Sequence, residues 1–314
     1  MRDAFIKALE KLADDDPRIF LITGDLGFGV LDRFATLRPR QFLNAGVAEQ
    51  NMTGLATGLA LEGRIVFTYS IANFPILRPL EFIRNDAAYH DANVNVVAIG
   101  GGFSYGALGI SHHATEDLAI MRSLPGMVVA SPCCDWEATE LVPALAGATG
   151  TSYLRLDRLS AGNTRQPGER FALGRIRVLE EGTDLTIAAT GGIMAEVLAA
   201  TASLRHKGVT CRVLSVHTIK PLDLPALVAA ARETGGILTV EEHTVDGGLG
   251  GAVAEALLEA GAVPRVFRRI GLRAGFSSIV GSQQYLRSVY GMDAESIARE
   301  AAAMLSTRPS SPAR

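Results

Sequence analysis

Short apolar segments alternate with segments of helical periodicity along almost the whole chain. In the first half, the segments that predict buried strands are residues 18–23, 64–68, 94–99 and 127–130. In the second half, a further series follows at residues 184–190, 210–215, 236–241 and 265–270. Strands that alternate with helices are typical of parallel sheets covered by helices on both faces. The pattern therefore predicts an α/β protein with two parallel-sheet domains.

The two series are separated by a segment with little apolar periodicity. It contains Gly162, Pro167 and Gly168, residue types that interrupt regular structure. We therefore expect a first domain at 1–160, a linker at 161–180 and a second domain at 181–306. The last residues, 307–314, are mostly Ser, Pro and Arg and predict a flexible tail.

Charge and composition exclude several classes of partner. The chain has 314 residues and a formal net charge of -3, so no basic surplus indicates nucleic acid or an anionic membrane as a partner. No apolar run approaches the roughly 18 to 20 residues that cross a bilayer. Charges interrupt the amino-terminal apolar residues, which argues against a secretory signal. We expect a cytoplasmic protein in which Cys133 and Cys134 are buried thiols of undetermined role.

The most informative segment is NAGVAEQNM, at residues 44–52, which places Glu49 at the head of a helix of small residues. A glutamate near a helix start is by itself more often a cap or a solvated charge. Here the small residues continue to Ala60, and an apolar strand follows at residues 64–67. This arrangement resembles the glutamate motif of the transketolase family of thiamine-diphosphate enzymes.

The second half carries further segments that are similar to this family. They are DLTIAATGG at 184–192, TIKPLD at 218–223, VEEH at 240–243 and GGLG at 247–250. They resemble the carboxy-terminal domain shared by transketolases, deoxyxylulose-phosphate synthases and the β subunits of 2-oxoacid dehydrogenases. The GGLG segment lacks the full pattern of a dinucleotide-binding loop, so we interpret it as tight packing of a helix on a sheet.

The resemblance implies cofactor-binding roles for five residues. In the family, a carboxylate at the position of Glu49 is hydrogen-bonded to N1′ of the aminopyrimidine and favours the imino tautomer, whose 4′-nitrogen takes the C2 proton. Phe74 matches an aromatic residue that packs on the pyrimidine, while Ile71 stands at a second aromatic position and supplies burial alone. Asp25 is a further candidate, with a helix or turn cap as the alternative. Arg78 is another, with the subunit interface as the alternative.

A glycine-rich loop carries the second catalytic candidate. Its segment SHHATE, at residues 111–116, resembles the Thr-His-Gln-x-x-Glu segment of the family, which implies that His112 stabilises alkoxides at the reacting carbons. An ordinary imidazole pKa near 6.5 suits that work. Ser111 and His113 are candidate substrate contacts. Arg158 matches a phosphate-binding arginine of some relatives, and a carboxylate would suit its guanidinium equally well.

Two positions depart from the pattern of sugar-phosphate transketolases. Those enzymes typically place a phosphate-contacting histidine twelve residues before the catalytic histidine and a hydroxyl-contacting aspartate four residues before it. This chain has Gly100 and Leu108 there, which predicts a specialised sugar or keto substrate. The alternative is that Ser104, Tyr105 or His113 restores the missing hydrogen bonds.

The diphosphate half of the cofactor site is missing from the sequence. In the family, a Gly-Asp-Gly motif followed by Asn after about 25 to 30 residues holds Mg²⁺, and the segment VDGG at 245–248 has no matching Asn. The resemblance thus implies a separate amino-terminal, diphosphate-binding subunit that binds Mg²⁺ and shares thiamine diphosphate with this chain, in an α2β2 assembly. We expect no metal ligand in this chain.

We therefore expect the pyrimidine-binding β-type subunit of a two-chain transketolase. It would transfer a two-carbon ketol unit from a ketose to an aldehyde, and only together with its partner. The Ser-His-His sequence at 111–113 also occurs in similar form in deoxyxylulose-phosphate synthases, so a 2-oxoacid enzyme of that kind, or an oxoacid dehydrogenase β subunit, is the first alternative. A non-catalytic stabilising subunit is the second, and the presence of both Glu49 and His112 argues against it.

Overall fold

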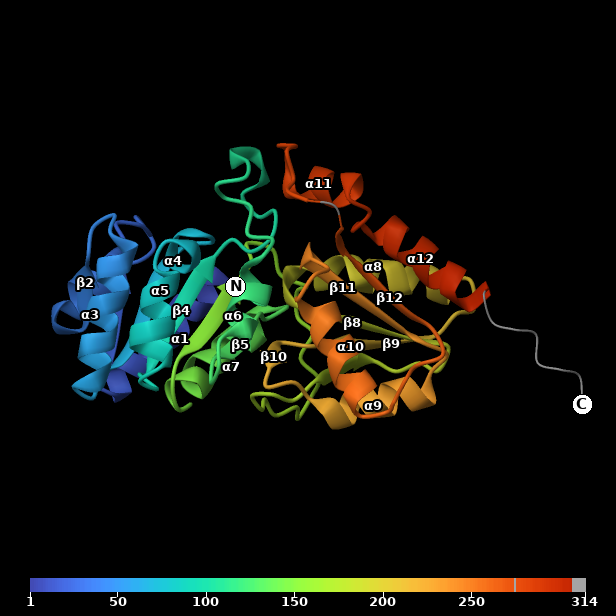
Figure 1. Ribbon diagram of the computed structural model, residues 1–314, viewed down its shortest axis with the longest axis horizontal. Coiled ribbons are helices and arrows are strands. Elements are labelled where there is room, and N and C mark those ends of the chain that lie inside the picture. Colours follow the sequence, from blue (N-terminus) through green and yellow to red (C-terminus); the bar gives the residue numbers. More distant parts are fainter. Residues whose placement is uncertain (274, 307–314) are drawn as a thin grey trace, which may run out of the picture.

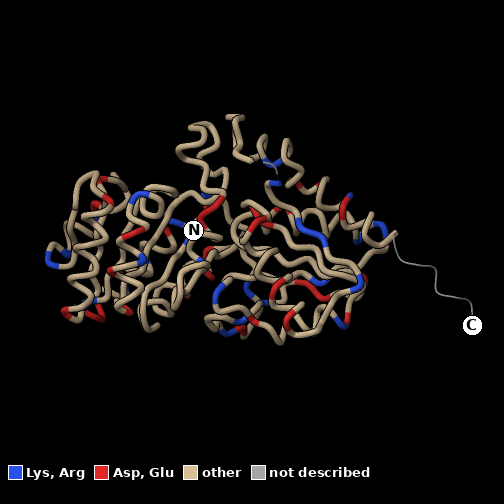
Figure 2. Tube along the Cα trace, in the orientation of Figure 1, with Lys and Arg blue, Asp and Glu red and all other residues tan. Residues whose placement is uncertain are grey.

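The computed structural model describes residues 1–273 and 275–306 and contains two sheets, each covered by helices (Figure 1). This confirms the α/β class and the two-sheet architecture. The tail expected at 307–314 lies outside the described residues. Within those residues, no helix is both long enough and apolar enough to span a membrane. Acidic and basic residues are interspersed in both halves (Figure 2).

The first sheet has seven strands in the order β10-β5-β6-β4-β3-β1-β2. These strands are β1 (Ile19–Thr23), β2 (Phe42–Asn44), β3 (Ile65–Ile71), β4 (Val94–Ile99), β5 (Val128–Ala130), β6 (Ser152–Leu156) and β10 (Thr218–Lys220). All pairs are parallel except β10 with β5. Every residue of β4 is buried, as its apolar sequence, interrupted only by Asn95, predicts for a strand with both faces covered.

Helices cover both faces of this sheet. They are α1 (Arg2–Asp15), α2 (Asp32–Leu37), α3 (Glu49–Leu61), α4 (Phe74–Leu77), α5 (Leu80–Phe82), α6 (Asp117–Ser123) and α7 (Asp135–Ala146). Short 3-10 helices lie at Pro39–Gln41 (η1) and Gly106–Leu108 (η3), and a π-helix lies at Ile83–Ala88 (η2). Helix α1 buries Phe5 and Leu9 completely, and the Phe5 ring packs against Phe67 and Tyr69 of β3. This burial explains the helical spacing of the amino-terminal apolar residues.

The second sheet has five strands in the order β12-β11-β8-β9-β7. Its strands are β7 (Arg177–Glu180), β8 (Leu185–Ala189), β9 (Cys211–Ser215), β11 (Ile237–Thr244) and β12 (Phe267–Leu272). The helices of this half are α8 (Met194–Arg205), α9 (Leu224–Glu233), α10 (Leu249–Glu259), α11 (Gln283–Val289) and α12 (Ala294–Ser306), with a short turn at Gly191–Ile193 (η4). Strand β7 runs antiparallel to β9, and the other pairs are parallel.

Two short antiparallel edge strands differ from the sequence prediction. Strand β7 occupies residues that we expected in the linker, so the second sheet begins at Arg177. Strand β10 comes from the second half of the chain but extends the first sheet. Both strands have only three or four residues, too few for a period-two pattern to stand out. The sheets are therefore mixed, with parallel pairs dominant, and β10 ties the two halves together.

Candidate cofactor and substrate site

The candidate residues gather at one edge of the first sheet. Asp25 lies just after β1, Ile71 ends β3 and Gly100 follows β4. Because these strands are parallel neighbours, their carboxyl ends meet at the same edge, where open α/β sheets commonly bind ligands. Helix α3 begins at this edge with Glu49.

Glu49 is held at the start of α3 by the turn before it. The Asn44 side chain accepts hydrogen bonds from the backbone N–H groups of Asp25 and Gly46, both at 3.0 Å. Gly46 has φ +73°, a left-handed conformation that favours glycine. Glu49 is 3% exposed, and its carboxylate lies in the first turn of the helix, where the helix dipole stabilises negative charge.

Arg78 is the ion-pair partner of Glu49. Its Nη1 donates to Glu49 Oε1 at 2.8 Å, and its side chain is half exposed. The guanidinium carbon also lies 4.2 Å from the centroid of the Phe74 ring, within cation–π range. The two residues expected to contact the pyrimidine, Glu49 and Phe74, are thus both in contact with Arg78.

Phe74 connects this pair to His112. The two ring centroids are 5.2 Å apart with the planes inclined by 71°, an edge-to-face contact. Phe74 begins α4 directly after β3, and the connecting Ala72 has φ +29°. A non-glycine residue in this region is strained, and such strain is concentrated at functional sites. Ile71, at the end of β3, is partly buried at the same turn.

His112 is positioned by its neighbour and remains partly exposed. Its Nδ1 lies 2.9 Å from Ser111 Oγ. Burial lowers the pKa of His112, and the nearby His113 and Arg78 lower it further, because each of these disfavours the charged imidazolium. At neutral pH the ring is therefore neutral and can donate and accept a hydrogen bond.

His113 points the other way, into the protein. It is 1% exposed, its Nε2 lies 3.0 Å from the carbonyl oxygen of Gly106, and its ring packs edge-on against Phe103. Its backbone carbonyl accepts a hydrogen bond from the Asn73 side chain at 2.7 Å. This burial argues against the substrate contact that we expected for His113, and the residue instead supports the loop that carries His112.

Tyr105 and Arg158 extend the site beyond His112. The Tyr105 ring centroid lies 6.2 Å from that of His112 and 5.4 Å from the Arg158 guanidinium carbon. Leu108, at the position expected for a hydroxyl contact, is 57% exposed. A cavity of about 620 Å³ lies between this loop and the second half of the chain. Its lining residues include Tyr105, Leu108, Arg158, Ser282, Gln283 and Gln284.

Asp25 is paired with Asn44 at the side of the Glu49 turn. Asn44 Nδ2 donates to Asp25 Oδ1 at 2.9 Å, and the Asp25 N–H donates back to Asn44 Oδ1. Asp25 has φ +59°, which aspartate tolerates better than most residues. The pairing gives Asp25 a role in shaping the turn, next to the expected cofactor position.

The three cysteines lie outside this site and are all buried and free. Cys133, Cys134 and Glu137 come within the reach of a shared metal ion. The Glu137 carboxylate, however, already accepts hydrogen bonds from Arg177 and Ser215 and from the backbone N–H of Cys133. The positive charge of Arg177 beside it also opposes a cation. We interpret the cluster as a polar contact between the first domain and strands β7 and β9.

The glycine-rich turn before α10 is closed by the chain itself. Glu241 accepts hydrogen bonds from the N–H groups of Leu249 and Gly250 at 2.6 and 2.8 Å, so its carboxylate fills the helix N-terminus. A Cβ on Gly248 would lie 2.1 Å from a Glu241 carboxylate oxygen. The tight packing expected for this segment is therefore observed.

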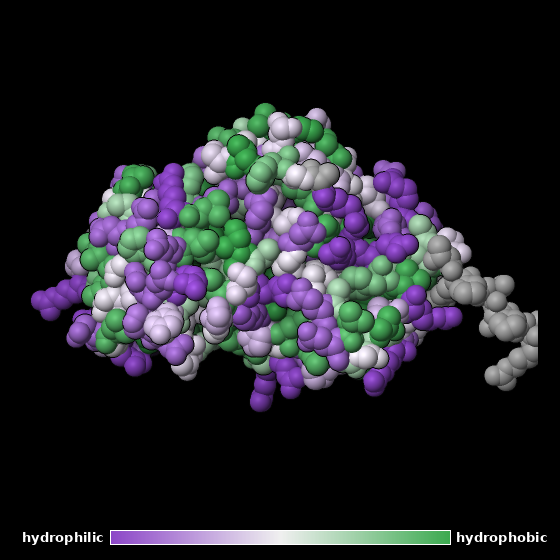
Figure 3. All heavy atoms as spheres, in the orientation of Figure 1, coloured by the Kyte–Doolittle hydropathy of each residue, from purple (hydrophilic) through white to green (hydrophobic). Residues whose placement is uncertain are grey.

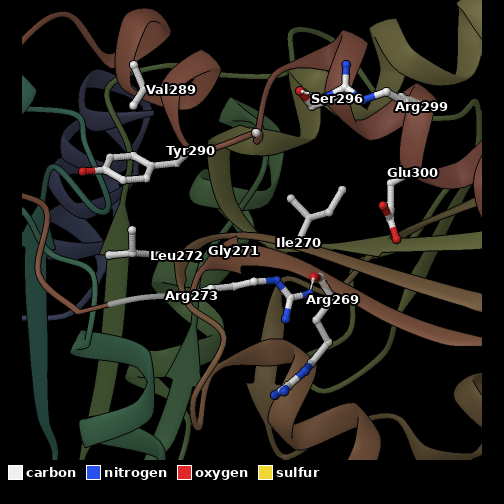
Figure 4. A pocket seen from close by; sticks show the side chains of 11 residues that line it. Arg269, Ile270, Gly271, Leu272, Arg273, Val289, Tyr290, Ser296, Arg299 and Glu300 are labelled. Atoms are coloured by element: carbon white, nitrogen blue, oxygen red, sulfur yellow. Dashed lines mark hydrogen bonds between the residues drawn. The ribbon is translucent and has the colours of Figure 1, made fainter.

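The second half also has a cavity of its own, of about 430 Å³ (Figure 4). Arg269, Arg273 and Arg299 line it together with Ser296 and Glu300. Arg269 and Arg273 donate to the backbone carbonyls of Val245 and Arg269, respectively. None of the candidate cofactor or substrate residues lines this cavity.

Asn73 is a contributor to the site that the sequence did not indicate. It holds the His112 loop through the backbone of His113, and the sequence holds no signal for this long-range contact. Arg78 was a cofactor candidate, but its direct contact with Glu49 was not expected. Its signal was its position four residues after Phe74 on a helical segment, which allows it to lie over that ring.

With this geometry established, comparison with known proteins shows the family. Residues 1–163 match the pyrimidine-binding domain of transketolase, and residues 174–297 match the transketolase C-terminal domain. The chain therefore belongs to the transketolase family. The family, the fold class and the assignment to a transketolase-type transferase subunit that acts with a second subunit, all predicted from the sequence, are confirmed.

Individual relatives are similar over nearly the whole chain. One subunit of the apulose-4-phosphate transketolase of Phocaeicola vulgatus is 38% identical, with 96% of each chain covered. The 6-deoxy-6-sulfo-D-fructose transketolase subunit SqwH of Clostridium sp. (strain MSTE9) is 37% identical, covering 96% of this chain and 93% of the relative. The 1-deoxy-D-xylulose-5-phosphate synthase of Thermomicrobium roseum is 35% identical over 98% of this chain, but the match covers 49% of its own length.

Solved structures agree with this assignment. A structure described as a split-gene transketolase in an inactive β4 tetramer superimposes with a TM-score of 0.89 at 37% identity, covering 98% of this chain and 99% of that chain. A transketolase from Campylobacter jejuni gives a TM-score of 0.80 at 17% identity, covering 96% of this chain and 46% of that longer chain. The second likeness shows a shared fold.

Proposed function

We propose that this chain is the pyrimidine-binding subunit of a two-chain, thiamine-diphosphate-dependent transketolase. The reaction transfers a two-carbon ketol unit from a ketose donor to an aldehyde acceptor. The observation that carries the proposal is the buried Glu49 carboxylate at the start of α3, in one continuous line of contacts through Arg78 and Phe74 to His112.

The residues present fit the pyrimidine half of the cofactor. A carboxylate is buried at 3% exposure beside an aromatic ring that remains partly exposed, as a flat heterocycle with a protonated ring nitrogen requires. When bound, thiamine diphosphate supplies the carbanion chemistry that no side chain provides. Glu49 would hold the ring nitrogen, Phe74 and Ile71 would bury the ring, and Asp25, paired with Asn44, would shape the turn before Glu49.

The chain's own residues then have distinct tasks. Glu49, whose charge is compensated by Arg78 and by the helix dipole, accepts the hydrogen bond that fixes the pyrimidine tautomer. His112, neutral and oriented by Ser111, donates a proton or hydrogen bond to substrate oxygen as negative charge develops and takes it back as that charge collapses. Arg158 binds an anionic group at the far end of the sugar.

A second chain completes the site in this proposal. It would supply the diphosphate and Mg²⁺ contacts and associate as α2β2. A surface suited to such a partner lies at the top of the molecule, where the η3 loop and α11 stand next to each other (Figures 1 and 3). Its exposed apolar residues are Leu108, Ile110, Phe276, Ile279, Val280 and Tyr285. Exposed apolar residues that gather on one face are typical of interaction surfaces.

The substrate is expected to differ from a common pentose phosphate. Leu108 and the face of the Tyr105 ring present carbon atoms where hydrogen-bonding groups were expected. Substrate hydroxyl groups that face them would lose water without gaining a hydrogen bond. Two relatives are named for unusual substrates, apulose 4-phosphate and 6-deoxy-6-sulfo-D-fructose. These names support a specialised sugar with an anionic end group.

One experiment separates this function from the alternatives. The purified chain, reconstituted with its partner, is given either a ketose with an aldehyde acceptor or pyruvate with the same acceptor. Transketolase activity predicts a ketose two carbons longer than the acceptor and no carbon dioxide from pyruvate. Carbon dioxide release from pyruvate would support the 2-oxoacid alternative. If neither reaction occurs although the partner alone binds the cofactor as tightly as the pair, the non-catalytic alternative stands.

A further inference from the structure

The loop between β4 and His112 is fixed by both halves of the chain. The Phe103 N–H donates to Glu242 Oε1 at 2.5 Å, and the Gly106 carbonyl accepts from the Gly281 N–H at 3.3 Å as well as contacting His113. A Cβ on Gly106 would lie 2.6 Å from the carbonyl oxygen of Gly281. The loop is therefore packed without spare room, and the Tyr105 side chain that it carries has a defined position.

The Tyr105 ring lies directly on Gly100. Gly100 has φ +94°, and a Cβ at this position would lie 2.1 Å from Tyr105 Cε2 and 2.4 Å from Cδ2. Any side chain at residue 100 would displace the ring. The Tyr105 ring therefore occupies the space that a side chain at residue 100 would need. The sequence alone indicates only that residue 100 lacks the polar side chain found in sugar-phosphate transketolases.

The Arg158 guanidinium lies over the face of the Tyr105 ring. The guanidinium carbon lies 5.4 Å from the ring centroid, within cation–π distance. Tyr105 and Arg158 together line the 620 Å³ cavity and a second one of about 280 Å³ near the amino terminus. In that second cavity Asp135 is paired with the amino terminus, and Arg2 with Asp3. Among residues 1–273 and 275–306, no carboxylate forms an ion pair with Arg158, so its charge is available to a ligand.

We propose that Tyr105, seated on Gly100, is a specificity-determining residue that positions the Arg158 guanidinium for an anionic end group of the sugar. The inference rests on the proposed function and names the substrate feature that this part of the site recognises: a phosphate or another oxyanion such as a sulfonate. The Tyr105 ring centroid lies 6.2 Å from that of His112 and 5.4 Å from the Arg158 guanidinium carbon, so the ring adjoins both the histidine assigned to the reacting carbons and the arginine assigned to the anionic end. Arg158 binds the anion, and the Tyr105 ring limits the directions in which the guanidinium can point.

The test compares acceptors with and without the anion in the reconstituted pair. With hydroxypyruvate as donor, a transferred ketol unit leaves carbon dioxide as the second product. The readout is the ratio of kcat/KM for ribose 5-phosphate to kcat/KM for ribose. Arg158→Ala is expected to lower this ratio by about tenfold or more, because a charge-assisted hydrogen bond is lost. Tyr105→Ala should lower it by about threefold to fivefold through loss of the ring beneath the guanidinium.

Further variants separate positioning from general damage. Tyr105→Phe keeps the ring and should keep the ratio. The double variant Tyr105→Ala with Arg158→Ala should resemble Arg158→Ala alone, since the ring acts through the guanidinium. Gly100→Ala should reproduce the Tyr105→Ala ratio by displacing the ring, and should add nothing when Tyr105 is already Ala. Tyr89→Ala, at a residue that is 82% exposed, is the matched control for loss of a tyrosine and should leave the ratio unchanged.

The outcomes distinguish this inference from the proposed function. If the wild-type pair forms no product with either acceptor or any ketose, the proposed function fails. If it transfers but shows no preference for the phosphorylated acceptor, or if Tyr105→Ala and Gly100→Ala keep the wild-type ratio, the positioning role of Tyr105 is wrong. Inhibition of ribose turnover by inorganic phosphate and by methanesulfonate then identifies which oxyanion Arg158 accepts, and inhibition by neither would also overturn the inference.

Discussion

Arg78 donates a hydrogen bond from Nη1 to Glu49 Oε1 at 2.8 Å and at the same time lies over the ring of Phe74. Glu49 is almost completely buried, whereas the Arg78 side chain is half exposed. Arg78 thus compensates the charge of the buried carboxylate from within this chain. The same contact places Arg78 against both groups that we expect to hold the pyrimidine.

Replacing Arg78 tests this compensation. Arg78→Ala leaves the Glu49 carboxylate buried without its ion partner, and we expect the free energy of unfolding to fall by about 1 to 2 kcal/mol, less than for a fully buried pair because Arg78 is half exposed. Urea denaturation of the isolated chain measures it. Arg84→Ala, an exposed arginine of the following turn, is the control and should change stability little. Equal destabilisation by the two variants would show that the pair does not compensate the buried charge.

Glu49→Gln tests the catalytic role of the carboxylate. The amide keeps the size and hydrogen-bonding capacity of the side chain but removes the charge that favours the imino tautomer. Because positioned proton-transfer groups typically contribute about 10² to 10⁴ in rate, we expect deuterium exchange at C2 of thiamine diphosphate bound to the reconstituted pair to slow within that range. A well-folded variant that exchanges at the wild-type rate would show that Glu49 has been misassigned.

Protonation of His112 should cause kcat/KM to fall on the acidic side of its pH profile. Its pKa is lowered by burial and by His113 and Arg78, so the neutral ring persists to a pH below the ordinary value of about 6.5. If neutral His112 is the active form, kcat/KM should stay level down to about pH 6.5 and fall only below it. His112→Gln should lower kcat and remove this limb. A loss of activity that begins above about pH 7, or a limb that survives in His112→Gln, contradicts the assignment.

We expect protonation of His217 to destabilise the fold at acidic pH. Burial lowers its pKa, Nδ1 contacts Thr218 Oγ1 at 2.8 Å, and Nε2 is buried and has no hydrogen-bond partner among residues 1–273 and 275–306. Since the folded pKa lies below the unfolded one, the unfolded chain binds the proton more readily, and stability is lost as pH falls through about 6.5 and below. We expect the urea midpoint to fall between about pH 7.5 and about pH 5.5, and to fall less in His217→Gln. An equal fall in both proteins would exclude this residue as the cause.

Local signals in the sequence predicted most of the fold and the position of Glu49 at the start of a helix. Buried strands such as β4 and β8 are apolar runs with one polar residue each, Asn95 and Thr186. Glu49 stands three residues after Gly46 and begins a helix rich in small residues, so neither feature needed tertiary information. The edge strands β7 and β10 were not predicted, because they have only three or four residues and are stabilised by pairing with β9 and β5, respectively.

Side-chain direction was the part that the sequence did not determine. His112 and His113 are adjacent in a loop, where no periodicity says which one faces solvent, and the structure turns His113 inward onto Gly106. The contact of Tyr105 with Gly100 depends on a positive φ and on a loop held by the other half of the chain. Arg78 and Glu49 are 29 residues apart in the sequence. Their contact forms only when folding brings them to the same edge of the sheet.

The central claim is that this chain provides half of an active site, and one measurement tests it most directly. Ketol transfer from hydroxypyruvate to an aldehyde is followed with thiamine diphosphate and Mg²⁺, for the chain alone, for its diphosphate-binding partner alone and for an equimolar mixture of the two. We expect turnover in the mixture and none in either separate chain, because Glu49 and His112 lie on this chain while a Gly-Asp-Gly motif with its matching Asn is absent from its sequence. Thiamine-dependent turnover by the purified single chain would contradict this division of the site.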